Sequence, residues 1–509
     1  MTRAVASVLI RSVYVLLLFA GSTIQYLKGQ TTLSACAQPG SEVGTQLNAA
    51  IKTLVAGGTG GIVDATCYAG EQHINSNMLA GVGTSLPITV KLAPATFVLA
   101  SSGAQQVLTA SNFTLEGSGT YGTTIEFNDP QNDIFVIPNT GASSVGIRNL
   151  IIRQAATSNK TAGNVFNVQG QQAVIRDIQL FDPYNGFFVY NAFSNQFQNI
   201  WISTTRSGTL NYGFYLYGTD IDNFFTDIYG TSSYPTEDAF LHIRNRVSGG
   251  RFSNISFQSN NNSSPGSGIL FDCGSSPTTG EACTNAYSGN PLNRPELLHF
   301  DKVFIEAGTS GNAVTVNGGQ DLRFTNSYFA TSLTGFSISG ESTAIDIGDS
   351  IIVNMQHQCI YDNAGSMIWR FASLNVHDDE IGICSQAANQ RYPAIELAPN
   401  INHVGIIGNH IGHNTFTNFA WDSPIAVKVS DPHTYVRILD NDLTSFNANG
   451  ISFYSGFSGP ITGSPGTGDS WLNNIGFSQI TSTGFTGTKI AGPCTFAIEN
   501  GIITNVTGC

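Results

Sequence analysis

One pattern recurs at a fixed short interval in the middle of the chain. Each copy holds two pairs of alternating apolar residues separated by one polar residue, as in Leu298–Ile305. Alternation at period two is typical of a strand with one buried face. Strand pairs that recur at a short fixed interval are typical of a solenoid. The sequence therefore predicts an all-β solenoid, and three successive copies have their polar residue 24 positions apart, at Lys302, Asn326 and Ser350.

The same polar position can be followed through most of the chain. Asn and Asp suit such corners because they tolerate a left-handed backbone and form hydrogen-bonded stacks. One interval is lengthened by an insertion, Asn260–Pro295. The predicted corner residues are Asn149, Asp177, Asn199, Asp227, Asn254, Lys302, Asn326, Ser350, Ser373, Asn409 and Asn441.

The segment before the first strands has helical periodicity. Leu47, Ala50, Ile51 and Leu54 recur at helical spacing within Ser41–Leu54. A bare coil edge invites pairing with other chains, so we expect this short amphipathic helix to cover the open first coil. The predicted organisation is a signal peptide over residues 1–37, a β-helix domain over 38–480 and a C-terminal cap with a disulfide over 481–509.

The N-terminus indicates export. Arg3 and Arg11 precede the apolar run Val13–Ala20, which is too short to span a bilayer. No later run is long and apolar enough to span a membrane, so we expect a secreted, extracellular protein without a transmembrane segment. An alternative is a lipid anchor on Cys36, since Leu33–Cys36 resembles a lipobox, but the polar stretch Gln25–Thr32 argues against it.

Eight cysteines indicate disulfides, because an even count in an exported chain favours them over metal sites. Cys359 and Cys384 are one coil apart in sequence, which would place them within disulfide reach on stacked coils. A lipid on Cys36 would leave Cys67 without a partner. The predicted neighbouring pairs are Cys36–Cys67, Cys273–Cys283, Cys359–Cys384 and Cys494–Cys509.

The charge of the chain excludes one class of partner. The formal net charge is −13, and no basic stripe is visible in the sequence. Nucleic-acid binding requires such a stripe, so no nucleic acid is expected as a partner. An acidic surface is compatible with neutral or cationic sugars, whereas a polyuronate would need a local basic patch or a bridging cation.

The opening of the predicted solenoid resembles a known family. The helix is followed by Gly61–Ala65, Val90–Phe97 and Asn112–Gly119. This order is similar to the opening of the pectate-lyase superfamily of right-handed parallel β-helices, and most of all to members related to polygalacturonase-type glycoside hydrolases. The resemblance covers residues 41–127 and continues as a general coil pattern to about residue 480. It implies a right-handed, single-stranded parallel β-helix with a polysaccharide partner; fold alone does not imply the reaction.

The densest group of ionisable residues is Val376–Glu380. Hydrolysis of a glycosidic bond needs two carboxyl groups, and adjacent coils supply suitable separations. The resemblance implies that Asp378 and Asp379 act as acid and base, assisted by a histidine and an arginine on later coils. The family's Gly-His-Gly and Arg-x-Lys motifs are absent. The alternative is that both aspartates are solvated turn residues; the assisting candidates are His403, His413 and Arg437.

Aromatic residues form a second signal. A row of exposed tyrosines on adjacent coils would form a platform for sugars, although Phe and Tyr stacks also fill β-helix interiors. Asp220 with Asp222, or Glu237 with Asp238, would supply a carboxylate pair beside it. The predicted substrate-binding residues are Tyr184, Tyr190, Tyr215, Tyr217 and Glu306.

Three functions are compatible with these residues. The first is a secreted glycoside hydrolase acting on an extracellular polysaccharide. The second is a polysaccharide lyase of the same fold, which would need Ca²⁺; otherwise no cofactor or metal is expected. The third is a non-catalytic surface or adhesive protein in which the coils are scaffold.

Overall fold

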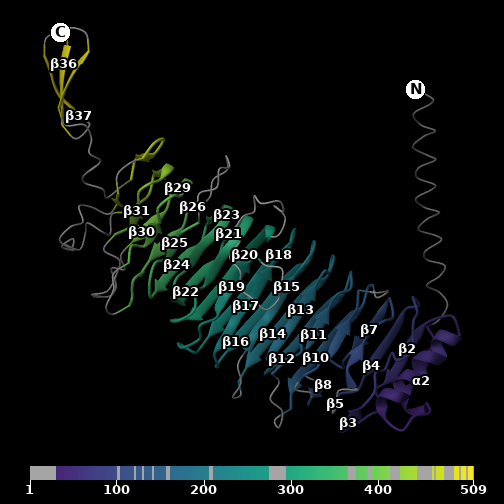
Figure 1. Ribbon diagram of the computed structural model, residues 1–509. Coiled ribbons are helices and arrows are strands. Elements are labelled where there is room, and N and C mark those ends of the chain that lie inside the picture. The colour runs from purple at the N-terminus through teal and green to yellow at the C-terminus, as the bar shows by residue number, and fades with distance from the viewer. Residues whose placement is uncertain are drawn as a thin grey trace, which may run out of the picture.

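A single parallel solenoid forms the body of the molecule. Figure 1 shows its strands stacked side by side along one long direction. Within the described residues, 34 strands form one continuous sheet whose strand pairings are all parallel, which confirms the predicted all-β parallel β-helix. The computed structural model describes residues 30–507 except 100–103, 120–121, 129–130, 140–142, 156–160, 206–209, 274–293, 365–373, 388–391, 413–424, 444–460, 464–465, 475–486, 492–493 and 500–501, with side chains left out for Glu341 and for 487–507.

Each coil contributes to three faces, which we number in chain order within a coil. The first face contains β1 (Thr32–Ser34), β2 (Gly61–Ala65), β4 (Ile88–Leu92), β7 (Phe113–Glu116), β26 (Leu374–His377), β29 (Asn402–Ile407), β32 (Thr434–Leu439) and β34 (Ser470–Leu472). The second contains β3 (Glu71–Ile74), β5 (Thr96–Leu99), β8 (Thr124–Phe127), β22 (Tyr328–Ser332), β24 (Ile351–Met355), β27 (Glu380–Gly382) and β30 (His410–Gly412).

The third face contains β6 (Gln106–Val107), β9 (Phe135–Ile137), β11 (Phe166–Val168), β13 (Asn185–Tyr190), β15 (Leu210–Tyr217), β17 (Thr236–Arg244), β19 (Ser267–Asp272), β25 (Ile360–Asp362), β28 (Ile395–Leu397), β31 (Val427–Val429) and β33 (Ile461–Thr462). Longer strands bend from one face into the next. From the first to the second run β10 (Gly146–Gln154), β12 (Val174–Phe181), β14 (Gln196–Thr204), β16 (Phe224–Ser232), β18 (Arg251–Ser259) and β20 (Glu296–Gly308); from the third to the first run β21 (Val314–Thr325) and β23 (Phe336–Gly348).

The corner between the first and second faces has a left-handed backbone. Seven predicted corner residues have positive φ and are confirmed: Asn149, Asp177, Asn199, Asp227, Asn254, Lys302 and Asn326. In three later coils the prediction is one residue late, because the left-handed residue is Asp349, Gly408 or Asp440. Ser350, Asn409 and Asn441 point inward instead. Ser373 lies outside the described residues.

The interior is filled by apolar side chains at alternating strand positions. Two rows of phenylalanines stack from coil to coil with ring centroids 4.4–5.3 Å apart, close to the spacing of paired strands. The first row is Phe135, Phe166, Phe187 and Phe214; the second is Phe197, Phe225, Phe252, Phe300 and Phe324. Each ring is sandwiched between its neighbours, so the rows bind consecutive coils together.

The N-terminal end of the solenoid is covered by α2 (Val43–Ala56), which lies beside β2 and β4 (Figure 1). The predicted inward residues Leu47, Ala50, Ile51 and Leu54 are all buried, so the predicted capping helix is confirmed. Glu42 begins the helix through a capping box with Thr45, accepting hydrogen bonds from the backbone N–H groups of Gly44 and Thr45. None of the helices in the described part of the chain has the length and hydropathy of a membrane span.

Two predicted disulfides are present, Cys36–Cys67 and Cys359–Cys384. Because the Cys36 sulfur is bonded to Cys67, it is not available to a lipid. Cys273 is also disulfide-bonded, and its predicted partner Cys283 lies outside the described residues. The C-terminal region contains a separate antiparallel sheet of β35 (Gly487–Ala491), β36 (Cys494–Glu499) and β37 (Ile502–Thr507). Its role as a cap, and the pairing of Cys494 with Cys509, stay predictions.

The stacked rows predict that replacing an inner phenylalanine by alanine destabilises the fold more than replacing an outer one. Phe252 is 1% exposed, whereas Phe224, one coil earlier and on the outer surface, is 39% exposed. We expect Phe252→Ala to lower the free energy of unfolding by about 3–5 kcal/mol, because it opens a cavity inside a stack. Phe224→Ala is the matched control and should cost less than about 1 kcal/mol. Denaturant unfolding measures both; equal costs would contradict the assignment of the row to the core.

Candidate functional site

Asp379, a predicted catalytic residue, lies inside the solenoid and is 2% exposed. It belongs to a row of polar side chains just after the corner, each accepting a backbone N–H from the preceding coil. Ser350 N–H donates to Asp379 Oδ1 at 2.7 Å, and Asp379 N–H donates to Asn409 Oδ1 at 3.0 Å. We call this row the corner ladder; its members are Ser327, Ser350, Asp379, Asn409, Asn441 and Asn474.

The asparagines of the corner ladder also donate through Nδ2. Asn409 Nδ2 donates to the carbonyl of Val376 at 3.0 Å, and Asn441 Nδ2 to that of Ile406 at 2.9 Å. The equivalent atom of Asp379, Oδ2, is buried without a hydrogen-bond partner among the described residues. Ile347 is the register partner of Val376, so we expect Oδ2 to point toward the carbonyl of Ile347. Two acceptors repel unless one carries a proton.

Burial raises the pKa of the Asp379 carboxyl to about 7, because a buried anion loses its hydration. A protonated Oδ2 would act as a donor, as an asparagine amide does in this row. Asp379 therefore has a structural explanation that requires no substrate, and it is not accessible to a glycan in this structure.

This arrangement predicts a pH-dependent stability. Between about pH 4 and pH 7 the folded state retains a proton on Asp379 that the unfolded chain loses, so stability falls as pH rises through this window. Asp379→Asn should remove this slope and raise the free energy of unfolding at pH 8 by about 1–3 kcal/mol, since the orphan atom becomes a donor. Denaturant unfolding at several pH values is the measurement. Asp378→Asn, at an exposed neighbour, is the control; a loss of stability in Asp379→Asn at every pH would refute the ladder assignment.

Asp378 lies at the corner itself, with positive φ and a side chain 64% exposed. Its Oδ2 lies 3.0 Å from His377 Nδ1, while Asp346 Oδ1, on the preceding coil, lies 3.5 Å from His377 Nε2. The ring extends across Gly348, where a Cβ would collide with it. Burial opposes charging of His377, but its hydrogen bond to the Asp378 carboxylate and the charge of Asp346 raise its pKa overall. One imidazole thus bridges two carboxylates on the outer surface.

Two other predicted catalytic residues, His403 and Arg437, do not lie around Asp378. His403 lies at the opposite end of β29, about 16 Å along the strand, and stacks on Tyr435 with ring centroids 4.7 Å apart. Arg437 is exposed on the first face, two coils or roughly 10 Å along the axis from the coil of Asp378. His413 lies outside the described residues. The charged side chain next to Asp346 is Arg323, its partner in strand register.

The predicted tyrosine platform divides into two parts on the third face. Tyr215 is 4% exposed and stacks on His242 with ring centroids 4.4 Å apart. It is therefore buried and cannot form part of an exposed platform. Tyr190 and Tyr217 are partly exposed and stack on each other at 5.4 Å. Tyr184 lies at the edge, where its hydroxyl donates to Glu237 Oε2 at 3.3 Å. Of the predicted platform, the stacked pair Tyr190 and Tyr217 therefore keeps partly exposed rings on adjacent coils, as sugar binding would need.

A buried ionic network lies beside these tyrosines, at the register positions of the following coils. His242 contacts Asp238 through Nδ1 at 2.5 Å and Asp272 through Nε2 at 2.9 Å, and Arg244 approaches Asp272 at 3.4 Å. Burial opposes charging of His242, yet these two carboxylates raise its pKa to about 9. With the imidazole protonated, two cations balance two anions. Asp220, of the other proposed pair, is fully buried and accepts the N–H of Ala192.

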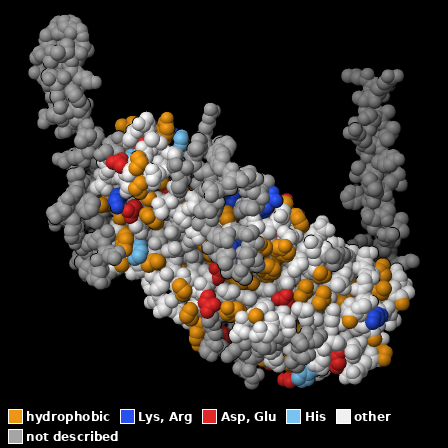
Figure 2. All heavy atoms as spheres, viewed as in Figure 1, with side chains coloured by type: hydrophobic (Ala, Val, Ile, Leu, Met, Phe, Trp, Pro, Cys, Tyr) orange, Lys and Arg blue, Asp and Glu red, His pale blue; other side chains and the backbone are white. Residues whose placement is uncertain are grey.

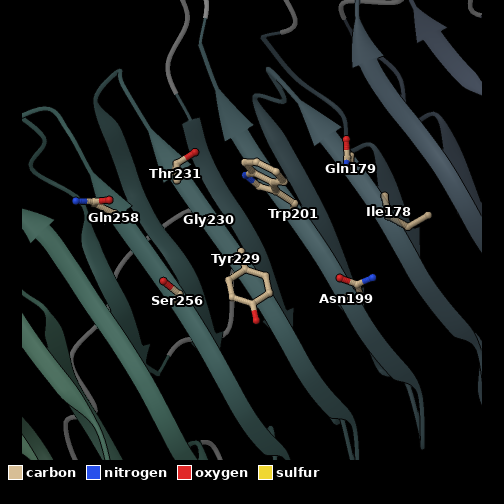
Figure 3. Close-up of a pocket in the computed structure, with 9 residues that line it drawn as sticks. All are labelled: Ile178, Gln179, Asn199, Trp201, Tyr229, Gly230, Thr231, Ser256 and Gln258. Atoms are coloured by element: carbon tan, nitrogen blue, oxygen red, sulfur yellow. The ribbon is translucent and has the colours of Figure 1, made fainter. Parts of the chain in front are cut away.

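A groove on the second face holds exposed aromatic side chains that sequence reasoning missed. Trp201 on β14 and Tyr229 on β16 are partners in strand register, and they are 44% and 40% exposed. Figure 3 shows them side by side on neighbouring strands, with Gln179 and Gln258 to either side. The groove has a volume of about 560 Å³, within the usual range of ligand sites. Its lining is Ile178, Gln179, Asn199, Trp201, Tyr229, Gly230, Thr231, Ser256 and Gln258.

Glu306, a predicted binding residue, lies at the edge of this groove. Gln258 Nε2 donates to Glu306 Oε2 at 2.8 Å, which orients the amide that lines the groove. At the corner, Asn254 Nδ2 donates to the Tyr229 hydroxyl at 2.8 Å and so fixes the direction of that ring. The sequence signal was available: both rings occupy outward positions of strands whose inward neighbours, Ile200 and Ile228, are apolar.

Comparisons with known proteins give no family for this chain. No family model matches it, and no curated protein does. Among solved structures, the A-module of the mannuronan C-5 epimerase AlgE4 of Azotobacter vinelandii is similar at TM-score 0.47 and 12% identity, over 87% of this chain and 97% of that one. The catalytic domain of a GH87 α-1,3-glucanase is similar at TM-score 0.42 and 13% identity, over 88% and 69%. A tailspike protein of E. coli bacteriophage HK620 is similar at TM-score 0.41 and 12% identity, over 86% and 76%. At such values function is argued from the side chains of this chain alone.

Proposed function

We propose that this chain is an extracellular β-helix that binds a polysaccharide along the groove of Trp201 and Tyr229. The observation that carries the proposal is the pair of exposed rings on consecutive coils. Sugar rings present apolar C–H faces that pack on aromatic rings, and their hydroxyls take hydrogen bonds from amides. The groove supplies both kinds of contact.

The lining favours a neutral sugar at this position. None of the nine lining residues carries a charge, and three of them, Gln179, Asn199 and Gln258, offer amide groups. Figure 2 shows that Lys, Arg, Asp and Glu side chains are sparse on the face of the molecule in view. The extracellular location is supported by the two disulfides, which persist in oxidising compartments.

Binding to a panel of neutral polysaccharides, measured by affinity electrophoresis and calorimetry, tests the proposal. We expect Trp201→Ala to weaken binding about 10-fold or more, since loss of a central aromatic contact costs at least about 1.4 kcal/mol. Tyr435→Ala is the matched control, because Tyr435 is also an exposed aromatic, at 48%, but lies at the far corner of the first face. Unchanged binding in Trp201→Ala, or equal loss in Tyr435→Ala, would remove the groove as the binding site.

A second candidate function is glycoside hydrolysis at Asp346 and Asp378. Their contacts to opposite nitrogens of His377 set the carboxyl groups roughly 7–9 Å apart, within the range of acid and base in inverting glycosidases. Because the imidazole lies between them in this structure, this candidate requires the ring to turn aside and admit the sugar and the water. One carboxyl would protonate the leaving oxygen while the other activates water.

Release of reducing ends from a broad glycan panel measures this activity. We expect Asp346→Asn and Asp378→Asn each to lower the rate about 100-fold or more, because each removes a proton-transfer group. Asp440→Asn, at the same corner two coils later, is the control and should have no effect. A chelator should not change a hydrolase, whereas loss of activity with unsaturated products would indicate a Ca²⁺-dependent lyase. No cleavage of any glycan, with binding retained, would leave a non-catalytic binding protein.

A further inference from the structure

A second groove, on the first face, contains two arginines side by side. Arg148 on β10 and Arg176 on β12 are partners in strand register, and both side chains point outward. Their exposed fractions are 34% and 41%. Like charges directly opposite on neighbouring strands repel and destabilise the sheet. Such a pair is retained here in a chain of net charge −13 with only 21 lysines and arginines.

The carboxylates nearby neutralise this pair only in part. Glu116, on the preceding coil, accepts from Arg148 Nη2 at 3.0 Å. Asp177 lies 3.8 Å from Arg176 Nε, but its Oδ1 already accepts the amide of Asn199 at 2.8 Å. Arg251, which follows Phe224 in the same outward row, adds a further positive charge. The groove therefore offers guanidinium groups to an anion, and paired guanidiniums match the oxygens of a carboxylate or sulfate.

The shape of the groove fits a sugar unit and not only a small ion. Its volume is about 630 Å³. Gly146 forms part of the floor, where a Cβ would lie 3.0 Å from Thr114 Oγ1, so a side chain here would fill the hollow. Phe224, 39% exposed, stands at one end, and Gln172 and Gln196 supply amides along the walls. An aromatic face can pack on a sugar ring, amides can hydrogen-bond its hydroxyls, and the arginines can pair with its acidic group.

We propose that this groove binds an acidic sugar unit, one that carries a carboxylate or a sulfate ester. The inference deepens the proposed function, on which it rests, because it assigns charge to part of the bound glycan. Strand β12 supplies Arg176 to this groove and Gln179 to the groove of Trp201, on either side of the corner Asp177. One glycan with neutral and acidic units could thus contact both faces.

The test is binding of three probes to the full chain: a uronate oligosaccharide, a sulfated oligosaccharide and inorganic sulfate, each by calorimetry at low salt. We expect at least one acidic oligosaccharide to bind, and the double variant Arg148→Gln/Arg176→Gln to bind it about 10-fold more weakly or worse. The probe that binds identifies the acidic group. Phe224→Ala should weaken the oligosaccharide and leave sulfate unaffected.

Arg153→Gln is the matched control, since Arg153 is also half-exposed and ion-paired, to Glu126 at 2.9 Å, but lies on the second face. Equal loss in this control, or binding of inorganic sulfate as tight as that of the oligosaccharides, would overturn the proposal. Neutral glycan binding separates this result from the proposed function. It should be weakened about 10-fold or more in Trp201→Ala and unchanged in the arginine variants, so failure of either site is seen independently.

Discussion

Backbone hydrogen bonds between consecutive coils are the constraint on which this structure depends. They hold each strand in register with its equivalent one coil away, so a residue type that suits one position is repeated above and below it. The phenylalanine stacks inside, the corner ladder, and the aligned Trp201 and Tyr229 outside are three results of the same register. A coil by itself buries too little to fold, and stability is therefore a property of neighbouring pairs.

Features set by local periodicity could be predicted from the sequence. The strand pattern, α2 and the disulfides Cys36–Cys67 and Cys359–Cys384 all follow from spacing along the chain, and the structure confirms them. The corner was harder to place in late coils, because two consecutive positions there suit polar residues. The first is the left-handed corner residue, and the second points inward. Asn409 and Asn441 satisfy backbone groups inside the solenoid. The predicted hydrogen-bonded stacks form at earlier corners, where Asn199 donates to Asp177 and Asn254 to Asp227.

The candidate site shows why alternation fails at a corner. Val376 points inward and His377 outward, so simple alternation would turn Asp379 outward. The left-handed residue Asp378 breaks the alternation and turns Asp379 into the core. Asp378 therefore points to solvent, whereas Asp379 points into the interior of the solenoid. Asp346 and Asp378, far apart in sequence, meet at one imidazole instead, a contact that no spacing within one coil predicts.

The distribution of charge follows the same division between inside and outside. Only 11% of residues are charged, yet several are buried with their partners, as in the network of His242, Arg244 and Asp272. Loss of one member would leave an uncompensated buried charge, which is costly. The outer grooves differ in character: one is uncharged and aromatic, and the other displays two arginines.

The spacing of the corners has a consequence for how such a molecule can change. Asp177 and Asn199 are separated by far fewer residues than Asn254 and Lys302, but both pairs occupy equivalent positions on adjacent coils. Extra chain is thus absorbed where a coil leaves one face for the next, and the faces keep their pitch. Insertions can enlarge the loops that border a binding surface while Trp201 and Tyr229 stay aligned. Ligand specificity can therefore change through these loops without disturbing the strand pairing of the solenoid.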